Sequence, residues 1–274
     1  MRVVPGIRLS ILAVCALAAI SVSALATSGA AGRAQQERCL NPNRTGTSGD
    51  DVLTGTRGSD RMVGLGGADI MNGLQGNDCM DGGPGFDLLS GANGNDSLYG
   101  ETGPDDLSGG RGNDTLSGGE GFDFLEGGIG RDTLRGEGGP DDLTGGHGPD
   151  DLFGGPGIDF LSGGLEGDAL NGEEGADDLE GGKGNDRLNG AGGNDRLSGG
   201  LGNDNLVGDL GNDRLDGGDG TNRYAAGDGN DFIDAANGRN DNVGCGPGTD
   251  TVLADAGDRL FDCERISRLR PSNR

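Results

Sequence analysis

The chain has 274 residues, of which 63 are glycine, and it contains no tryptophan and few phenylalanine or tyrosine residues. This composition leaves too little bulky apolar material for an ordinary globular core of that length. The formal net charge of −25 at pH 7 excludes nucleic acid and anionic membranes as favourable partners, and it favours cations.

The N-terminal segment has the pattern of a secretory signal peptide. Two arginines precede a run of small and apolar residues from 9 to 26, which ends in Ala24-Leu25-Ala26. A basic start, an apolar centre and small residues before the cleavage point are typical of such peptides, so we expect residues 1–26 to be removed. The alternative is a membrane anchor, although the run is short for a span and rich in Ala and Ser. The sequence thus predicts an exported chain, secreted or held at the cell surface, with no membrane span after cleavage.

Four cysteines remain after removal of the signal peptide: Cys39, Cys79, Cys245 and Cys263. An even number in an exported protein favours disulfides. The economical pairing joins Cys245 to Cys263, and joins Cys39 to Cys79 so that a polar lead-in, residues 27–45, is clipped onto the first repeats. Four cysteines allow three connectivities, so this pairing is a hypothesis.

Residues 46–233 repeat every nine residues without an insertion. In the unit from Gly109 to Ser117, glycine occupies positions one, two and four, Asp114 is position six and Leu116 is position eight. The Asp, followed two residues later by an apolar side chain, recurs along the whole stretch. A fixed short period predicts a solenoid in which each repeat stacks on its neighbours.

Each unit is expected to contain a turn of six residues and a strand of three. The side chain at position eight points inward because neighbouring side chains of a strand face opposite sides. Two units complete one coil, so equivalent atoms recur every eighteen residues, and adjacent coils are spaced by about 4.8 Å. The predicted fold class is all-β, a β-helix-like solenoid of nonapeptide repeats with a thin continuous core.

That geometry collects the position-six carboxylates into two rows. The first Asp row contains Asp51 and Asp69 and continues in steps of eighteen, and the second Asp row contains Asp60 and Asp78 and continues likewise. Carboxylates at strand spacing repel one another unless cations lie between them. Carboxylate and backbone carbonyl oxygens bind hard cations, and flexible glycine loops suit calcium better than octahedral magnesium. The competing interpretation, that each Asp only caps a tight turn, is disfavoured by the many repetitions.

The array resembles the hemolysin-type (RTX) calcium-binding nonapeptide repeat, Gly-Gly-x-Gly-x-Asp-x-apolar-x. The resemblance covers residues 46–233 and implies a right-handed parallel β-roll, in which each Ca²⁺ lies between a turn and the turn one coil further on. It also implies that multiple Ca²⁺ ions are held by loop carbonyls and position-six carboxylates. Carried over to this chain, the implied metal ligands are Asp51, Asp60, Asp69, Asp78, Asp87, Asp96, Asp105, Asp114, Asp123, Asp132, Asp141, Asp150, Asp159, Asp177, Asp186, Asp195, Asp204, Asp213 and Asp231.

The match to this repeat is weaker at several places, among them Leu65 to Gly67 and Gly138-Gly139, where a glycine is shifted within the turn. Glu166 and Gly167 precede Asp168, which is therefore left out of the implied ligands, Asn222 replaces an acid, and Ala226 replaces a first glycine. Toxins and proteases of this type carry an effector domain and lack an N-terminal signal. This chain, with a signal and no evident effector domain, looks closer to the exported repeat-only proteins of actinobacteria.

A second period, of 36 residues, lies within the units of the first Asp row. Phe122 and Phe124 flank one Asp of that row, and Ile158 and Phe160 flank the Asp 36 residues later. Positions five and seven both face outward, so these side chains predict an apolar stripe on one outer face. The stripe is either a by-product of the duplication of a four-repeat block or a contact surface.

Beyond Ile233 the nine-residue register slips by one residue. We expect residues 234–264 to form a divergent C-terminal cap that covers the last apolar layer, and residues 265–274 to form a basic tail. His147 is the only histidine, so a His-based triad or a zinc site is not expected. No catalytic motif is evident, and the chain is not expected to be an enzyme.

The sequence therefore predicts an exported calcium-binding protein whose β-roll folds on binding multiple Ca²⁺. The alternative is a calcium-stabilised cell-surface adhesion or matrix protein that uses the apolar face to bind a cell-surface or polysaccharide partner.

Overall fold

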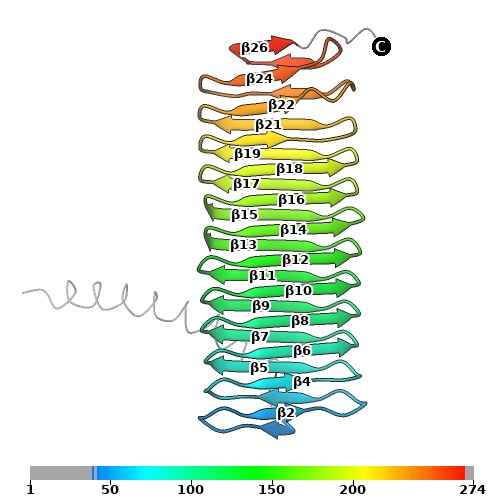
Figure 1. Cartoon of the computed structure of the whole chain (residues 1–274), viewed down its shortest axis with the longest axis vertical. Coiled ribbons are helices and arrows are strands. Elements are labelled where there is room, and N and C mark those ends of the chain that lie inside the picture. Colours follow the sequence, from blue (N-terminus) through cyan, green and yellow to red (C-terminus); the bar gives the residue numbers. More distant parts are fainter. Residues whose placement is uncertain (1–38, 40–41, 269–274) are drawn as a thin grey trace, which may run out of the picture. The chain divides into compact units, whose positions relative to one another are not determined.

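The structure is a computed structural model that describes residue 39 and residues 42–268 (Figure 1). All the described strands belong to the unit Pro42–Arg274. The predicted signal peptide, residues 1–26, lies outside the described residues.

The strands form two sheets of thirteen, an odd sheet and an even sheet named after the strand numbers. The odd sheet contains β1 (Arg44–Thr45), β3 (Arg61–Val63), β5 (Cys79–Pro84), β7 (Ser97–Thr102), β9 (Thr115–Glu120), β11 (Thr133–Gly138), β13 (Asp151–Gly157), β15 (Ala169–Gly175), β17 (Arg187–Gly192), β19 (Asn205–Leu210), β21 (Arg223–Asp228), β23 (Asn242–Gly244) and β25 (Arg259–Phe261). The even sheet contains β2 (Val52–Thr54), β4 (Ile70–Asn72), β6 (Leu88–Asn93), β8 (Asp106–Arg111), β10 (Phe124–Ile129), β12 (Asp142–His147), β14 (Phe160–Leu165), β16 (Asp178–Lys183), β18 (Arg196–Leu201), β20 (Arg214–Asp216), β22 (Phe232–Ala235), β24 (Thr251–Ala254) and β26 (Arg265–Arg268).

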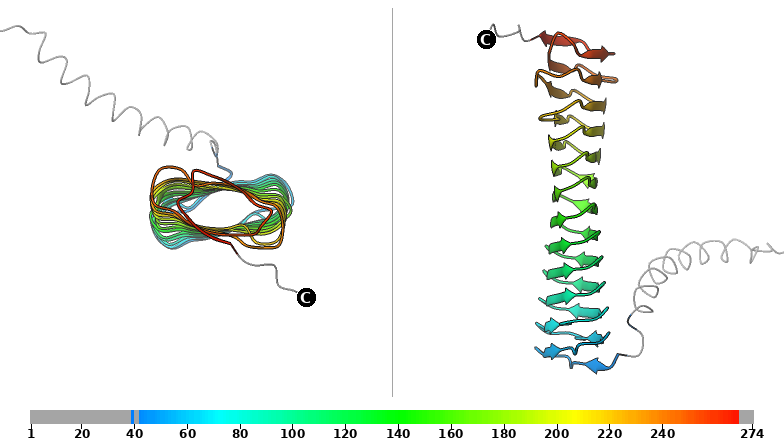
Figure 2. Two further views of the ribbon diagram at one scale, coloured as in Figure 1. Left: turned by 90° about the horizontal axis from the view of Figure 1, so that it is seen from above. Right: turned by 90° about the vertical axis from the view of Figure 1, so that its right-hand side faces the viewer.

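Each strand pairs in parallel with the strands one coil before and after it. In the even sheet β10 pairs with β8 and β12, so that Leu125 lies opposite Leu107 and Leu143, eighteen residues away on either side. Seen along the stack, the two sheets form the long sides of a flattened coil (Figure 2). The predicted all-β parallel solenoid of two repeats per coil is therefore confirmed.

The predicted division of each repeat into a long turn and a three-residue strand is wrong for most coils. From β5 to β19 the strands have six or seven residues, because positions one to three continue the ladder after the apolar residue. Gly128 and Ile129, for example, pair with Gly146 and His147. Gly128 does so at a φ of 107°, which glycine adopts without the steric cost that a Cβ would bring.

The core is one continuous column of the side chains at position eight. From Met62 to Leu215 these Met and Leu side chains are almost fully buried, and Tyr224, Ile233, Val243 and Val252 extend the column. Their stacking follows from the strand register, because each lies opposite its equivalent in the next coil. The interior is thus only as wide as two facing side chains, which makes it thin for the length of the stack.

The C-terminal strands continue both sheets. β23 and β25 extend the odd sheet, and β24 and β26 extend the even sheet. Within residues 42–268 no helix is long and apolar enough to cross a membrane.

Two of the predicted features of the cysteines can be compared with the structure. The disulfide between Cys245 and Cys263 is present, as predicted. Cys39 and Cys79 are also disulfide-bonded, while their pairing with each other stays a prediction. Disulfides of this kind fit an oxidising environment.

Candidate metal sites in the turns

The position-six Asp residues end the turns and lie immediately before the strands. The first Asp row leads into the even sheet and the second into the odd sheet, so that Asp105 precedes β8 and Asp114 precedes β9. Both side chains are buried, with 0% and 2% of their surface exposed. Two lines of buried carboxylates thus run along the stack, as the period predicted.

One oxygen of each carboxylate is used within its own row. The backbone N–H of Asp87 donates to Oδ1 of Asp105 at 2.8 Å, and the N–H of Asp105 donates to Oδ1 of Asp123 at 2.8 Å. The same bond joins successive members of both rows through the centre of the stack. This ladder fixes the orientation of every carboxylate and leaves the second oxygen, Oδ2, turned away from it.

The Oδ2 atoms are buried and have no hydrogen-bond donor among the described residues. This holds for Asp69, Asp78, Asp87, Asp96, Asp105, Asp114, Asp123, Asp132, Asp141, Asp150, Asp159, Asp168, Asp177, Asp186, Asp195, Asp204, Asp213, Asp231 and Asp250. An unpaired buried carboxylate oxygen is costly, so such a long series needs a physical explanation.

The first glycine of each repeat brings a second oxygen to the same place. A Cβ built on Gly100 would lie 2.4 Å from Oδ2 of Asp105 and 2.6 Å from the carbonyl oxygen of Gly118, one coil further on. At Gly109 the corresponding distances are 2.5 Å to Oδ2 of Asp114 and 2.8 Å to the carbonyl oxygen of Gly127. Glycine leaves open the space on which the two oxygens converge, and a side chain would fill it.

The donor set suits a hard cation. Among the described residues no three His, Cys, Asp or Glu side chains come together, so a metal in a turn would depend on backbone carbonyls as well as carboxylates. Carboxylate and carbonyl oxygens without nitrogen or sulfur are the ligands that Ca²⁺ prefers. The residues of the turns therefore fit calcium.

The electrostatics of the rows point the same way. Burial, together with the neighbouring carboxylates of the row, raises the pKa of Asp105 and of Asp114 to about 7. The pKa of Asp150 is also raised to about 7, by burial first and then by Asp132 and other nearby acids. Burial and the neighbouring acids thus destabilise the charged form of each of these carboxyl groups, and a cation beside it would offset that cost.

The first turn of each row differs from those that follow. Oδ2 of Asp60 accepts hydrogen bonds from the backbone N–H of Thr56 at 2.5 Å and from its hydroxyl at 2.9 Å. Thr47 makes the same pair of bonds to Asp51. Although burial opposes it, the bonds from Thr56 keep the pKa of Asp60 below its ordinary value. Asp51 and Asp60, both among the predicted ligands, therefore have a protein donor where the interior members have none.

Two further Asp residues share the interior arrangement although the sequence analysis did not assign them as ligands. Oδ1 of Asp168 accepts the N–H of Asp150 at 2.9 Å, and its Oδ2 has the same unpaired position as its neighbours. Glu166 and Gly167 thus leave this carboxylate in line, and the intact nine-residue step was the signal that could have found it.

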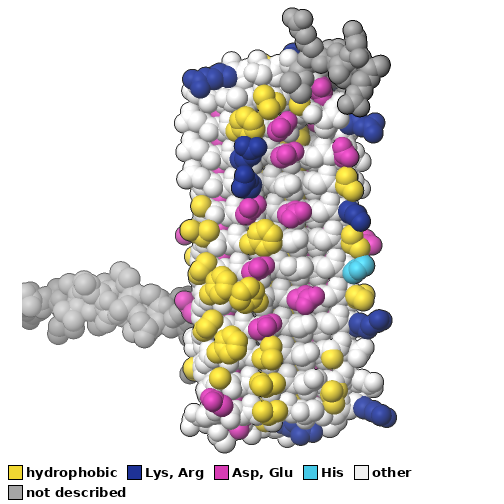
Figure 3. All heavy atoms as spheres, in the orientation of Figure 1, with side chains coloured by type: hydrophobic (Ala, Val, Ile, Leu, Met, Phe, Trp, Pro, Cys, Tyr) yellow, Lys and Arg dark blue, Asp and Glu magenta, His cyan; other side chains and the backbone are white. Residues whose placement is uncertain are grey.

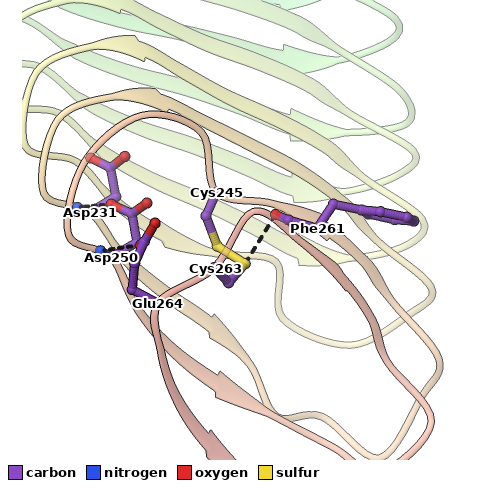
Figure 4. Close-up of a disulfide and its surroundings, with 6 residues drawn as sticks. All are labelled: Asp231, Cys245, Asp250, Phe261, Cys263 and Glu264. Carbon is purple, nitrogen blue, oxygen red and sulfur yellow. Dashed lines mark hydrogen bonds between the residues drawn. A yellow bond between two sulfur atoms is a disulfide. The ribbon is translucent and has the colours of Figure 1, made fainter.

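Asp250 extends the first row beyond the register slip. The N–H of Asp231 donates to Oδ1 of Asp250 at 2.9 Å, and the N–H of Asp250 donates to Oε2 of Glu264 at 3.0 Å (Figure 4). Glu264 therefore stands where the next Asp of the row would be. The Asp-x-apolar pattern of Asp250 and Val252 was the signal for this turn.

The fold and the turns define a parallel β-solenoid built from nonapeptide repeats with oxygen-lined turns. The family described as the RTX calcium-binding nonapeptide repeat matches residues 45–79, 81–116, 108–143, 117–152, 126–161, 144–178, 162–197, 171–206 and 198–233. The chain belongs to this family of calcium-binding repeats, which confirms the resemblance.

No curated protein matches the sequence. Among solved structures, the chain is similar to a hyperactive, Ca²⁺-dependent, β-helical antifreeze protein from an Antarctic bacterium, at 17% identity and a TM-score of 0.46. The likeness covers 84% of this chain and 81% of the other, and at this level it says nothing about what the present chain binds.

Proposed function

We propose that the chain is an exported protein whose solenoid folds on binding several calcium ions. The single observation that carries the proposal is the series of buried Asp Oδ2 atoms without a donor among the described residues. The ligands would be these carboxylates and the carbonyls of the first glycines, such as Gly118 beside Asp105. Bound calcium supplies the positive charge that the rows lack.

The energetics of the stack support folding that depends on the ion. Without a cation, each row places carboxylates at strand spacing along its whole length, where they repel. The core that opposes this repulsion is a single column of Met and Leu side chains. A core of this width cannot offset the conformational entropy of so many glycine-rich turns, so the free energy of metal binding becomes the free energy of folding.

Export would match the chemistry of the site. Extracellular calcium modules work at about 10⁻⁴ to 10⁻³ M calcium, well above the concentration at which intracellular sensors respond. The leader-like segment at residues 9–26 and the disulfides support a destination outside the cell. The chain would then stay unfolded until it reached a calcium-rich medium.

The experiment is a far-UV circular dichroism titration of residues 27–274, first with calcium and then with magnesium. We expect a cooperative change from disorder to β-structure near millimolar calcium and no such change with magnesium, because the turns provide flexible oxygen ligands rather than a rigid octahedron. A spectrum that is already β-rich in EDTA and indifferent to calcium would overturn the proposal.

A second function, adhesion through an outer face, is supported by the stripe of apolar side chains on the even sheet. Figure 3 shows yellow side chains gathered in a column along this face, which contains Val52, Ile70, Leu88, Phe124 and Phe160. The column is interrupted by Asp106 and Asp142, which lie beside Phe124 in the register of the sheet.

The aromatic part of the stripe is exposed rather than folded onto the sheet. The Phe122 and Phe124 rings pack edge to face at 4.8 Å, yet 45% of each side chain is open to solvent. Large exposed apolar patches mark contact surfaces. Under this second function, the double substitution Phe124→Ser and Phe160→Ser would leave calcium binding intact. It would reduce binding to purified cell walls or polysaccharide, or change the oligomeric state. If neither surface binding nor the oligomeric state changed, the second function would be ruled out.

A further inference from the structure

The turn that ends at Asn222 departs from the rest of the second Asp row. Its backbone N–H still donates to Oδ1 of Asp241, at 2.7 Å, and its own Oδ1 still accepts the N–H of Asp204, at 2.9 Å. The ladder therefore passes through this turn unbroken. What changes is the set of atoms that face the carbonyl oxygens of the turn and Oδ2 of Asp241.

The side-chain amide of Asn237 lies among three of those oxygens. Its Nδ2 donates to the carbonyl of Gly218 at 2.8 Å, to Oδ2 of Asp241 at 3.1 Å and to the carbonyl of Gly220 at 3.3 Å. Two carbonyls of one turn and the carboxylate of the next are the kinds of ligand that a calcium ion between two turns would use. Here these oxygens instead accept hydrogen bonds from Nδ2 of Asn237, whose two hydrogens carry partial positive charge.

The orientation of this amide is determined by its other end. Oδ1 of Asn237 accepts the backbone N–H of Arg239 at 2.8 Å, so the oxygen faces a donor and the nitrogen faces three acceptors. The reverse orientation would oppose an oxygen to all three acceptors. The residue reaches this place because the step from Asn222 to Asp241 is nineteen residues, one more than in the interior.

Tyr224 fills the space that the first glycine keeps open in other repeats. Its hydroxyl accepts the N–H of Gly217 at 3.0 Å and donates to the carbonyl of Asp234 at 3.1 Å. A Cβ on Gly217 would lie 2.2 Å from this hydroxyl oxygen and 2.6 Å from Nδ2 of Asn222, whereas at Gly100 it would meet a carboxylate and a carbonyl oxygen. At this turn the Tyr224 hydroxyl and the Asn222 amide nitrogen thus occupy the place that a carboxylate oxygen and a carbonyl oxygen have in the interior.

We infer that the pair of turns at Asn222 and Asp241 is closed without calcium, with the Asn237 amide in the place of the cation. The inference rests on the proposed function, since it assigns which turns take calcium and which do not. The next turn of the row is closed likewise, because Oδ2 of Asp258 accepts the N–H of Asp255 at 2.5 Å. The calcium-dependent part of the second row then ends at Asp204, while in the first row the Oδ2 atoms of Asp231 and Asp250 stay without a donor among the described residues.

Hydrogen exchange read by mass spectrometry tests the inference on the mature chain. In EDTA we expect the amides of the two second-row turns, residues 217–224 and 236–243, to exchange at least about tenfold more slowly than those of the interior coils. Calcium should protect the interior coils and change these two segments little. Uniformly fast exchange in EDTA would overturn the inference and leave calcium-driven folding standing, whereas uniformly slow exchange would count against the proposed function instead.

Two substitutions separate the amide from the nearby disulfide, which both leave in place. Asn237→Asp turns the donor into a fourth acceptor, so we expect protection in EDTA to be lost, to return with calcium, and one more Ca²⁺ to bind per chain in calorimetric titration. Asn237→Ala removes the donor without adding an acid, and should lower protection in EDTA without raising the number of ions.

Asn203→Asp is the matched control for charge. Asn203 lies in the same row of turns, and its Oδ1 accepts the N–H of Thr221 at 2.8 Å, a bond that an Asp can also accept, as Asp50 does from Ala68. It should change neither the exchange of residues 217–224 and 236–243 nor the number of ions. If Asn237→Asp behaves like this control, the amide does not stand in for a cation.

Discussion

The interior turns and the turns at the ends of the rows are built on the same repeat but satisfy their carboxylates differently. In the interior, Oδ1 of Asp141 accepts the N–H of Asp123 at 2.9 Å, and its Oδ2 is buried without a donor among the described residues. At Asp60 the corresponding oxygen accepts two hydrogen bonds from Thr56, and at Asp241 it accepts one from Asn237.

Under the proposed function, an Asp at position six does not by itself make a turn dependent on calcium. The ladder through Oδ1 is common to both kinds of turn, so it determines the stacking of coils and not their need for a cation. That need depends on whether the turn supplies its own donor to Oδ2. The turns at Asp51, Asp60, Asp241 and Asp258 have such donors, whereas Asp250, near the C-terminal end of the first row, has none among the described residues.

A change of pH should have the largest effect on the difference between the two kinds of turn, because it changes the charge of the interior carboxylates. In the folded chain the pKa of Asp105, Asp114 and Asp141 is about 7, raised from 3.8 chiefly by burial. A carboxyl with a raised pKa favours the folded state while it is protonated, so its contribution is complete below about pH 4 and is lost as the pH rises through 6 to 7. Without calcium, circular dichroism should therefore show more β-structure at pH 5 than at pH 8.

In the presence of calcium the pH dependence of folding is reversed, so that acid disfavours folding, because protons and the ion compete for the same oxygens. The calcium concentration at the folding midpoint should rise by at least about tenfold between pH 7.5 and pH 5.5. At Asp60 the pKa is lowered, so this turn gains nothing from acid and loses stability as the pH falls through the lowered value. A midpoint that does not change over this range would contradict the assignment of the interior carboxylates as ligands.

A side chain at the first glycine of an interior repeat should have the next largest effect. The Cβ of Gly100→Ala would lie 2.4 Å from Oδ2 of Asp105, which forces the carboxylate away from the carbonyl of Gly118. We expect a loss of about 1–3 kcal/mol in the free energy of unfolding in calcium, and a higher calcium midpoint. Equilibrium urea unfolding at fixed calcium measures the first quantity, and the titration measures the second.

Gly192→Ala is the control for glycine entropy in this comparison. A Cβ at Gly192 has the carbonyl oxygen of Glu173 at 3.6 Å as its only close contact, and the backbone there needs no left-handed conformation. This variant should be neutral or slightly more stable. Ala226 already occupies a first position near the C-terminal end, so the interior change is expected to be tolerated by the fold and to act mainly on calcium affinity. Equal effects of the two variants would contradict that expectation.

Most of the fold could be predicted because the repeat itself encodes it. The nine-residue step places Leu107, Leu125 and Leu143 in one column and the Asp residues in two rows, and both arrangements follow from strand geometry alone. The length of the strands could not be predicted, because glycine at positions one and two is compatible with either a turn or an extended ladder.

The candidate site was predictable in its interior and not at its ends. The groups that donate to Oδ2 in the end turns come from positions that vary between repeats. One of them, Thr56, looks like an ordinary loop residue in the sequence. Asn237 lies within the register slip, where no spacing argument applies, and only the folded turn brings its amide to Asp241. Sequence periodicity identifies the acceptors, whereas the closure of a turn depends on irregular residues that it cannot place.

The smallest expected effect, and the sharpest test of the comparison, concerns Thr56. Thr56→Val keeps the shape of the side chain and the backbone N–H to Asp60 but removes the hydroxyl that donates to Oδ2 at 2.9 Å. We expect a loss of about 0.5–1.5 kcal/mol in the free energy of unfolding and a rise in the pKa of Asp60, since the hydroxyl contributes to its lowering.

For Thr56→Val, the change in the calcium sensitivity of the first coil is more informative than the size of the loss in unfolding free energy. With its hydroxyl donor removed, Asp60 comes closer to an interior carboxylate, so hydrogen exchange of the first coil should become more sensitive to calcium than in the unmodified chain. Thr102→Val, at an exposed position on the same sheet, should leave both stability and this sensitivity unchanged. If Thr56→Val lowers stability but leaves the calcium sensitivity of the first coil as it was, then donors to Oδ2 stabilise the end turns without substituting for the ion.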